Sequence, residues 1–332
     1  MNVLLTGSSG WLGRHLAPLL AADGHLVIGL DVAPGPDTQV LGTVADRPLV
    51  ARLMREHAID AVIHGAALHQ PDIARYPKQS FLDVNVAGTL NLLEEACAVG
   101  ATRFVFTSTT SLMISAEIRA GKGKGAAWLD EKTGPLMPRN IYGTTKLAAE
   151  QLCRLIHDEH GLPIIVLRTS RFFPEEDDQA HKIGLSGPNT KANELLHRRL
   201  TARDAAEAHR VALARAPSLG FGLFIVSAPT PFVPGEAEEL KKDAAGVIAR
   251  RYPDAPELYA RQGWTLPGSI DRVYDTTQAE QVMGFRCRDD FASVLEALRS
   301  DRPLPFAHDA DYVSPQQMLR SPSDQAASRI KG

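Results

Sequence analysis

The strongest constraint on the fold is an alternation of short apolar runs with longer amphipathic segments in the first half of the chain. The apolar runs are typical of buried strands: Asn2–Thr6, His25–Leu30, Ala61–His64, Arg103–Thr107 and Pro163–Arg168. The segments between them carry apolar residues at helical spacing: Trp11–Ala22, Pro48–His57, Val86–Val99 and Tyr142–His160. Strands that are apolar throughout and separated by helices predict an α/β fold, a doubly wound parallel sheet of the Rossmann type with helices on both faces.

Composition excludes several classes of protein. The 332 residues are 44% hydrophobic and 23% charged, with a formal net charge of -3. This composition disfavours disorder, and the net charge disfavours a protein that is basic overall and binds nucleic acid. No uninterrupted apolar span is long enough to cross a bilayer, and the opening residues lack the pattern of a secretory signal. Cys97, Cys153 and Cys287 are scattered and show no metal-ligand spacing. We therefore expect a cytoplasmic protein that binds neither nucleic acid nor membrane nor metal.

Three glycines lie between the first predicted strand and the first predicted helix. Gly7, Gly10 and Gly13 have G-x-x-G-x-x-G spacing in the segment that opens the helix. The first would permit a tight turn, the second would let the backbone approach a pyrophosphate, and the third would allow close contact between helix and strand. The helix start also presents N–H groups to an anion. The position of these glycines therefore predicts a dinucleotide site, whereas three spaced glycines elsewhere would indicate a simple turn.

An acidic residue at the end of the second predicted strand indicates which dinucleotide binds. Asp31 follows Gly13 at close to the ~20-residue spacing expected of an acid that binds the adenosine ribose. A carboxylate there accepts hydrogen bonds from the ribose hydroxyls and repels a 2′-phosphate, so NAD is favoured over NADP. The alternative is an exposed aspartate at a strand end. Asp46 either faces the adenine or caps the next helix.

The catalytic candidates are a tyrosine and a lysine one helical turn apart. Tyr142 and Lys146 form a Tyr-x-x-x-Lys pattern at the start of a predicted helix, so both side chains lie on one face. A nearby cation stabilises a phenolate and lowers the pKa of a tyrosine. A tyrosine and a lysine at this spacing, without other motifs, usually lie on the surface or contribute to packing. Here the hydroxyl-rich run Thr107–Ser111 ends the preceding strand, at the edge where ligands bind in this architecture.

Taken together, these motifs resemble those of the extended short-chain dehydrogenases/reductases, in the NAD-dependent epimerase/dehydratase family of UDP-glucose 4-epimerase-like proteins. The resemblance extends from Met1 to about Pro231. The motifs that carry it are Thr6-Gly7-x-x-Gly10-x-x-Gly13, Asp31, Ile63-His64-Gly65-Ala66-Ala67, Asn85-Val86-Ala87-Gly88-Thr89-Leu90-Asn91, Phe106-Thr107-Ser108-Thr109, Tyr142-x-x-x-Lys146, Arg168 and Asp204. Each motif alone is common, and their order along one chain is specific.

The resemblance implies an NAD-dependent enzyme that oxidises a secondary alcohol to a ketone. Tyr142 would be the general base, Lys146 would tune it, and Thr109 (or its neighbour Ser108) would hydrogen-bond the reacting oxygen. The implied cofactor contacts are Gly7, Ser9, Gly10, Trp11, Leu12, Gly13, Asp31, Asp46, Ala66, Asn85, Tyr142 and Lys146. For Asn85 and for His64 we prefer a structural role, as a helix-start cap and as a satisfied strand-end histidine.

Two departures from the family pattern bear on the substrate. The substrate-binding insertion after Arg168 is short, because Asp204 follows within just over thirty residues. The frequent family asparagine after that strand is replaced in the Ser170-Arg171 region. Both departures weaken the case for a nucleoside-diphosphate sugar. The Thr-Asp-Glu triplet of sugar 4,6-dehydratases is also absent, because Thr110 and Ser111 follow Thr109, so that reaction is disfavoured.

Candidate substrate contacts combine polar loop residues with arginines. The candidates are His69, Gln70, Thr109, Tyr142, Arg171 and Arg199. Guanidinium groups suit planar anions, so Arg171 and the His197-Arg198-Arg199 cluster would clamp a carboxylate or a phosphate. The alternative is a solvated basic face paired with the acids at 175–178, and for Arg198 we prefer that alternative. The glycine- and lysine-rich segment Ala116–Trp128 is either a lid over the crevice or a tolerated surface loop.

The second half of the chain is expected to add a small lobe. A helix at Thr201–Ala216 and a strand at Phe221–Ser227 return to the first domain, while Gly184–Asn189 is turn-like. Beyond a Pro/Gly linker we expect short helices without a clear second sheet: Ala237–Tyr252, Thr277–Met283 and Phe291–Arg299. This gives an NAD-binding Rossmann domain at 1–170 with 200–230, a substrate lobe at 171–199 and 231–305, and a polar tail at 306–332.

The predicted function is oxidation of a secondary hydroxyl on a carbohydrate or sugar-acid substrate, by a sugar epimerase or by a net dehydrogenase. No residue separates these two. The alternatives are a non-catalytic NAD-sensing or scaffold protein on the same fold, and a reductase of a non-sugar carbonyl. The apolar faces of Val86–Val99 and Tyr142–His160 favour a homodimer, although burial under the second lobe would also use them.

Overall fold

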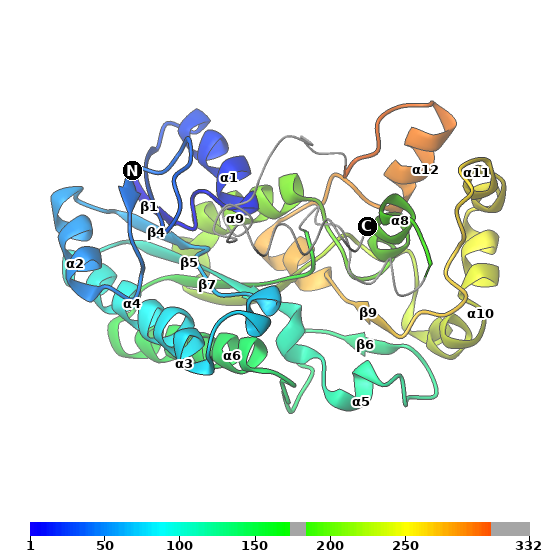
Figure 1. Cartoon of the computed structure of the whole chain (residues 1–332), viewed down its shortest axis with the longest axis horizontal. Coiled ribbons are helices and arrows are strands. Elements are labelled where there is room, and N and C mark those ends of the chain that lie inside the picture. Colours follow the sequence, from blue (N-terminus) through cyan, green and yellow to red (C-terminus); the bar gives the residue numbers. More distant parts are fainter. Residues whose placement is uncertain (173–183, 307–332) are drawn as a thin grey trace.

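The central element of the computed structural model is a seven-stranded parallel sheet, and the structure describes residues 1–172 and 184–306 (Figure 1). The strand order is β3-β2-β1-β4-β5-β7-β8. The strands are β1 (Asn2–Thr6), β2 (Leu26–Asp31), β3 (Val40–Leu41), β4 (Ala61–His64), β5 (Arg103–Thr109), β7 (Ile164–Thr169) and β8 (Phe221–Val226). All pairings are parallel, which confirms the predicted doubly wound sheet. The predicted charged stretch Glu175–Lys182 and the tail from 307 onward lie outside the described residues.

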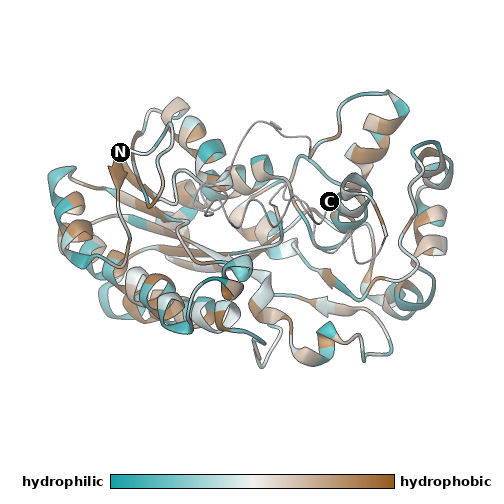
Figure 2. Ribbon diagram, in the orientation of Figure 1, coloured by the Kyte–Doolittle hydropathy of each residue, from teal (hydrophilic) through white to brown (hydrophobic). Residues whose placement is uncertain are grey.

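Helices cover both faces of the sheet and bury alternate residues of each strand. On one face lie α1 (Trp11–Ala22) and α9 (Ala202–Leu219); on the other lie α2 (Arg47–Glu56), α4 (Gly88–Val99) and α6 (Ile141–His160). Within β1, Leu5 packs against the first set of helices and Leu4 against the second. Because neighbouring strand residues point to opposite faces, a strand covered on both sides is apolar throughout. Figure 2 shows the resulting hydrophobic ribbon along these strands.

Local sequence signals fix where these helices begin and end. The side chain of Asp46 accepts a hydrogen bond from the N–H of Leu49 at the start of α2, and Asn140 accepts one from Gly143 at the start of α6. Gly100 and Gly161 end α4 and α6 in left-handed conformations, which glycine adopts without steric cost. These caps place the observed ends of α2, α4 and α6 within two residues of the predicted ones.

A smaller lobe packs beside the sheet and contains structure that the sequence patterns did not predict. Its helices are α8 (Gly187–Leu195), α10 (Ala237–Arg251), α11 (Ala255–Arg261) and α12 (Phe291–Arg299). They share one apolar core, to which Leu195, Val247, Tyr259 and Phe291 contribute. A two-stranded parallel sheet pairs β6 (Ala127–Leu129) with β9 (Arg272–Tyr274). The expectation of no second sheet was therefore wrong, because strands of three residues are too short to show alternation.

Short helical elements account for the other differences from prediction. The turn-like segment predicted at Gly184–Asn189 overlaps the start of α8, which the side chain of Ser186 caps. The short elements are η1 (Gln70–Ala74), α3 (Lys78–Phe81), η2 (Leu82–Ala87), η3 (Thr110–Met113), α5 (Ala116–Arg119), η4 (Pro234–Glu236) and η5 (Ala279–Met283). Of these, η2 and η5 are π-helical turns. The predicted helix Val86–Val99 therefore begins inside a π-helical turn, a geometry without a sequence signature but frequent at functional sites.

The segment between β5 and α6 is attached to the smaller lobe. The N–H of Ala126 donates to the carbonyl of Ala237 at 2.8 Å, and the N–H of Ala127 donates to that of Asp271 at 2.8 Å. A Cβ on Gly125 would lie 2.9 Å from backbone atoms of residues 237 and 238, so the glycine permits this close approach. The carboxyl end of the segment Ala116–Trp128 is thus part of the β6–β9 sheet.

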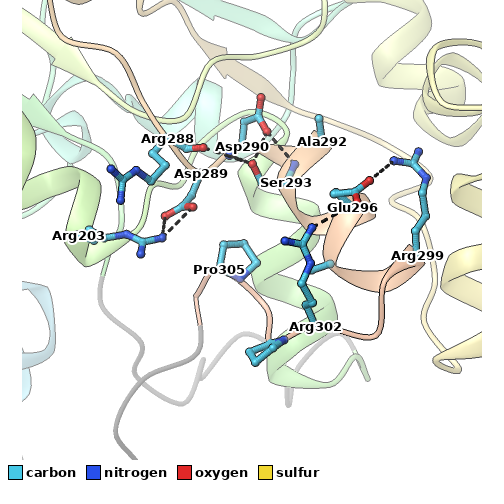
Figure 3. Close-up of a pocket in the computed structure, with 12 residues that line it drawn as sticks. Arg203, Arg288, Asp289, Asp290, Ala292, Ser293, Glu296, Arg299, Arg302 and Pro305 are labelled. Carbon is cyan, nitrogen blue, oxygen red and sulfur yellow. Dashed lines mark hydrogen bonds and ion pairs between the residues drawn. The ribbon is translucent and has the colours of Figure 1, made fainter.

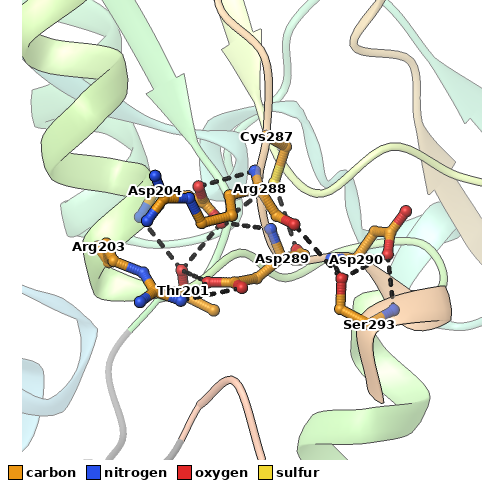
Figure 4. Close-up of polar contacts among 8 residues, drawn as sticks. All are labelled: Thr201, Arg203, Asp204, Cys287, Arg288, Asp289, Asp290 and Ser293. Carbon is orange, nitrogen blue, oxygen red and sulfur yellow. Dashed lines mark hydrogen bonds and ion pairs between the residues drawn. The ribbon is translucent and has the colours of Figure 1, made fainter. Parts of the chain in front are cut away.

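A polar network around Asp204 joins the smaller lobe to the start of α9 (Figure 4). The carboxylate of Asp204 accepts hydrogen bonds from the N–H groups of Arg288 and Asp289, at 2.9 and 3.0 Å, and from the thiol of Cys287 at 3.3 Å. Arg203, next to it, forms an ion pair with Asp289 at 2.7 Å. Since the residues at 287–289 lead into α12, this network fixes that helix relative to the sheet.

A buried ion pair joins α6 to the sheet. The carboxylate of Glu150 lies 2.7 Å from the guanidinium of Arg168 on β7, and it accepts a second hydrogen bond from the hydroxyl of Ser108 on β5 at 2.5 Å. Both charged side chains are at most 5% exposed. A pair this deeply buried is destabilising when one partner is removed, since the other charge remains without compensation.

Replacing Glu150 by Gln leaves the shape of this contact but removes the counter-ion of Arg168. We expect the free energy of unfolding in urea to fall by about 3–5 kcal/mol. The matched control is Asp158→Asn, on the same helix, because Asp158 pairs with Arg154 at the surface and such pairs contribute about 0.5 kcal/mol or less. Equal losses in the two variants would contradict a special role for the buried pair.

Candidate active site

Close contacts with neighbouring backbone require glycine at two of the three glycine positions in the loop between β1 and α1. Gly7 has φ +76, and a Cβ there would lie 2.9 Å from the backbone of Ala66. At Gly13 a Cβ would lie 2.3 Å from the carbonyl oxygen of Ser8. Gly10 differs, because the nearest atom to its added Cβ is the carbonyl oxygen of Gly7 at 3.3 Å. The fold itself therefore requires the first and last glycines, while Gly10 keeps side-chain atoms away from the backbone in the middle of the loop.

Asp31, at the end of β2, faces this loop. Its carboxylate accepts hydrogen bonds from the N–H groups of Ser9 and Ala33, each at 3.0 Å. Burial raises the pKa of Asp31, and the backbone hydrogen bonds oppose that rise. The hydroxyl of Ser9 donates to the carbonyl of Ala33 at 2.6 Å and so fixes the loop after β2 against the glycine loop.

These residues fit an adenine dinucleotide. Gly10, at the start of α1, has no side chain with which to cap the helix, and Trp11 and Leu12 form the first turn. The dipole of α1 is directed towards the glycine loop, an arrangement that suits a pyrophosphate. The lack of a side chain at Gly10, where an added Cβ would lie only 3.3 Å from the carbonyl oxygen of Gly7, suits a close approach of phosphate to backbone. Asp31 retains lone pairs for ribose hydroxyls, because one of its oxygens accepts from Ser9 and the other from Ala33, which leaves further acceptor positions on the carboxylate.

The other predicted cofactor residues hold the backbone of the surrounding loops. Asp46 caps α2. Ala66 donates its N–H to the hydroxyl of Thr6 at 3.2 Å. The amide of Asn85, in the π-helical turn η2, accepts from the N–H of Leu68 at 2.8 Å and donates to its carbonyl at 3.0 Å. Asn85 thus orders the loop after β4, and its side chain also donates to the hydroxyl of Thr145 on α6 at 3.1 Å.

Tyr142 and Thr109 meet at the carboxyl end of the sheet. Thr109 ends β5 and Tyr142 lies in the first turn of α6, and the hydroxyl of Thr109 is close enough to the phenol to influence its pKa. Burial raises the pKa of Tyr142 to about 12, although the hydroxyl of Thr109 opposes that rise. The ring of His69 lies 5.8 Å from that of Tyr142 between centroids, so the loop after β4 reaches the same place.

Lys146 lies one turn further along α6 and is 3% exposed. Its ammonium lies 4.2 Å from the centroid of the Phe106 ring. This cation–π contact joins α6 to β5, the strand that ends at Thr109. Burial lowers the pKa of Lys146 to about 7, and the charge of Glu150 opposes that shift. Phe106 and Glu150 were missed as site residues, although Glu150 stands four positions beyond Lys146, at the spacing that keeps it on the same helix face.

The two histidines near Lys146 are neutral. His64 shares hydrogen bonds with Thr6 at 2.8 Å and with Thr89 at 3.0 Å, so both ring nitrogens are used, as expected of a structural residue. Burial lowers the pKa of His64 well below its ordinary value and that of His69 to about 4, and the charge of Lys146 adds to both shifts. The positive charge at this end of the crevice therefore comes from lysine rather than from histidine.

The predicted substrate contacts divide into two groups. His69 and Gln70 begin η1, close to Tyr142. Arg171 and Arg199 lie opposite each other in an isolated bridge, and the buried Arg199 donates to Glu194 at 2.8 Å. The neighbouring side chain of Arg198 is only 21% exposed and also pairs with Glu194, so the expectation that it belongs to a solvated face was wrong.

Comparison with known proteins identifies the relatives of this arrangement. Residues 3–218 match the model of the NAD dependent epimerase/dehydratase family, which confirms the resemblance drawn from the motifs and the predicted cofactor class. A UDP-glucose 4-epimerase of Yersinia enterocolitica is 28% identical over 216 residues, covering 59% of this chain and 60% of the relative. A dTDP-glucose 4,6-dehydratase of Streptomyces antibioticus is 31% identical over 188 residues, covering 51% of this chain and 53% of the relative. The chain thus spans 60% or less of the length of these two curated relatives.

Solved structures share the fold over most of the chain. A short-chain dehydrogenase/reductase superfamily protein of Agrobacterium tumefaciens with bound NAD has a TM-score of 0.63 at 23% identity, covering 91% of this chain and 98% of that chain. The UDP-glucose 4-epimerase of Thermus thermophilus in complex with NAD has a TM-score of 0.59 at 21% identity, covering 90% and 99%. At these identities the likeness establishes the Rossmann-type fold.

Replacing Lys146 by Met should stabilise the cofactor-free protein. The folded-state pKa is about 7 and the ordinary value is 10.5, so below pH 7 the folded protein bears the full cost of a buried charge. Between those values the unfolded chain binds the extra proton, and the stability of the wild type rises with pH. We expect urea unfolding at pH 6 to show a gain of about 1–3 kcal/mol in Lys146→Met, decreasing as the pH approaches 10.

The control for this stability measurement is Lys242→Met, because Lys242 is exposed on α10. That variant should unfold as the wild type does at each pH. A Lys146→Met protein that is less stable than the wild type at pH 6 would show that the ammonium is well compensated in the fold.

Proposed function

Because the chain belongs to the NAD-dependent epimerase/dehydratase family, we propose that it oxidises a secondary hydroxyl of a carbohydrate or sugar-acid substrate. The observation that carries this proposal is the burial of Thr109, Tyr142 and Lys146 together at the edge of the sheet that also holds the glycine loop. The names of the relatives support a carbohydrate, since they are epimerases and dehydratases of nucleotide-linked glucose.

In this proposal each residue has a separate task. Thr109 hydrogen-bonds the reacting oxygen and orients it towards the phenol of Tyr142. Tyr142 removes the hydroxyl proton, while the ammonium of Lys146 stabilises the phenolate and so opposes the rise in pKa that burial chiefly causes. NAD, when bound, accepts the hydride from the carbinol carbon. Asp31 and the glycine loop would hold the adenosine and pyrophosphate parts of the cofactor.

The proposal covers two outcomes of the same first step. An epimerase retains the cofactor and returns the hydride to the opposite face, whereas a dehydrogenase releases NADH. Incubation with NAD and a panel of sugars and sugar acids distinguishes them: stoichiometric NADH absorbance indicates a dehydrogenase, and an inverted product without net NADH indicates an epimerase. A dehydratase is disfavoured, because Thr110 and Ser111 stand where that reaction requires acidic residues.

Two further features belong to this proposal. We infer a homodimer through α4 and α6, because both helices lie on the outside of the same sheet face and Leu155 is 48% exposed there. We also infer a cytoplasmic location, which suits three cysteines that are all free. The described residues contain no helix long and apolar enough to span a membrane, and no group of three potential metal ligands.

Removal of the phenolic hydroxyl tests the proposed base. In Tyr142→Phe we expect kcat to fall by about 10²–10⁴-fold while NAD binding stays within a factor of two or so, because the ring still fills its site. The control is Tyr76→Phe, which removes the hydroxyl of an exposed tyrosine. Normal turnover by Tyr142→Phe would refute this mechanism and would show that another group acts as the base.

Neutralising Asp31 tests the proposed cofactor preference. Asp31→Asn should weaken NAD binding by about tenfold or more, since a hydrogen bond to a charged group contributes roughly 1.5–3 kcal/mol. Loss of the negative charge should also reduce discrimination against NADP. Calorimetric titration of both cofactors measures the ratio, with Asp158→Asn as the acid-to-amide control. An unchanged ratio would remove Asp31 from the cofactor site.

A further inference from the structure

Buried polar side chains connect the glycine loop to the start of α6. They lie on β1, β4, η2, α4 and α6, and each is at most 1% exposed. We refer to them as the His64 network: Thr6, His64, Asn85, Thr89 and Thr145. Because water does not reach these groups, their donors and acceptors must be satisfied within the protein.

The directions of the hydrogen bonds fix which nitrogen of His64 carries the proton. The hydroxyl of Thr89 donates its one proton to the carbonyl of Asn85 at 2.7 Å. Thr89 must therefore accept from Nε2 of His64, which lies 3.0 Å away. In a neutral imidazole the other nitrogen is an acceptor, so the hydroxyl of Thr6 donates to Nδ1 at 2.8 Å. Thr6 in turn accepts from the N–H of Ala66 at 3.2 Å.

A charged His64 would disrupt this pattern. With a proton on Nδ1 as well, the oxygen of Thr6 would accept two hydrogen bonds and its own proton would lose the acceptor that Nδ1 provides. Burial lowers the pKa of His64 well below its ordinary value, and the charge of Lys146 adds to that shift. The geometry and the electrostatics therefore agree on a neutral ring with its proton on Nε2.

At its other end the His64 network reaches Tyr142. The amide of Asn85 donates to the hydroxyl of Thr145 at 3.1 Å, and that hydroxyl donates to the carbonyl of Tyr142 at 3.1 Å. The same amide accepts from the N–H of Leu68 at 2.8 Å, in the loop after β4. The next residue, His69, lies against the ring of Tyr142, with 5.8 Å between centroids. The network thus holds the backbone of the tyrosine and one wall of its ring.

Polar contacts at the surface are built differently. In the pocket of Figure 3, Arg299 and Arg302 lie 3.4 and 3.3 Å from the carboxylate of Glu296. All three side chains are exposed, so water competes for each contact and the pairs position their neighbours weakly. In the His64 network, by contrast, removal of one member leaves a buried partner unsatisfied.

We propose that His64 is a positioning residue that couples the glycine loop to Tyr142. Its Nδ1 holds Thr6, the residue directly before Gly7, and its Nε2 holds Thr89 and, through it, the turn that contains Asn85. This inference rests on the proposed function, because the group that is positioned is the proposed base. His64 itself touches neither the substrate nor the cofactor in this proposal.

Nitrogen NMR tests the predicted tautomer without any turnover. In protein labelled with ¹⁵N-histidine, the signals of His64 are assigned by their absence in His64→Gln. At neutral pH we expect a proton on Nε2 and none on Nδ1, with and without NAD. A proton on Nδ1 would overturn the proposal, because it would reverse the contact with Thr6.

Two substitutions separate the two nitrogens. His64→Asn places an amide oxygen near the position of Nδ1, so it keeps the contact with Thr6 and loses the one with Thr89. His64→Gln places an amide nitrogen near the position of Nε2, so it keeps Thr89 and loses Thr6. Both variants lose the ring, and the difference between them therefore reports the hydrogen bonds. His160→Asn and His160→Gln, at the exposed end of α6, are the matched controls.

The two ends of the network are measured separately. Calorimetric titration should show NAD binding weakened about three- to tenfold in His64→Gln and within about twofold of wild type in His64→Asn. In protein that contains fluorotyrosine, the ¹⁹F signal of Tyr142, assigned with Tyr142→Phe, should move in His64→Asn and stay in place in His64→Gln. With a substrate, kcat should fall about tenfold or more in His64→Asn, because the base is displaced.

The pattern across the variants decides the proposal. Equal effects of His64→Asn and His64→Gln, or the reverse pattern, would overturn it, since a histidine that only fills space is replaced equally badly by either. If both variants fail to fold, Thr6→Val and Thr89→Val remove the same two hydrogen bonds and should reproduce the results expected of Gln and Asn. If Tyr142→Phe turns over normally, the proposed reaction fails, while the titrations and the spectra still decide the coupling.

Discussion

The active-site geometry depends on the buried ion pair between Glu150 and Arg168. It joins α6, the helix that carries Tyr142 and Lys146, to β7, and the hydroxyl of Ser108 extends the contact to β5. Ser108 directly precedes the threonine that meets Tyr142. One carboxylate therefore fixes the helix against both strands from which the site is built, which matters because a shift of about 1 Å between reacting groups costs much of a catalytic rate.

The charges at the reactive edge follow from how each group is buried. His64 and His69 lose their protons on burial, and the charge of Lys146 reinforces that loss. Lys146 itself contacts the aromatic ring of Phe106, and such a contact stabilises an ammonium less than a carboxylate would. An active site that is to stabilise a phenolate gains from a cation that the fold leaves incompletely neutralised.

The sequence predicted the main sheet because its strands and helices carry strong local periodicity and each is capped by its own residues. Asn140 and Gly161, for example, mark the ends of α6 without reference to any distant segment. The pairing of β6 with β9 was not predictable in this way, because each strand has three residues and its partner lies far along the chain. The roles of Phe106 and Glu150 were missed for a similar reason, since both depend on which side chains the fold brings beside Lys146.

The end of the family match divides the chain into two parts. The family match ends at residue 218, and Thr109, Tyr142 and Lys146 all precede that point. Arg272 and Tyr274 follow it, on a strand that pairs with β6 from the matched part. Family membership therefore bears on how a hydroxyl would be oxidised, and it does not extend to the segment after residue 218. The β6–β9 pair joins these two parts of the chain, because one of its strands belongs to the matched part and the other to the segment that follows it.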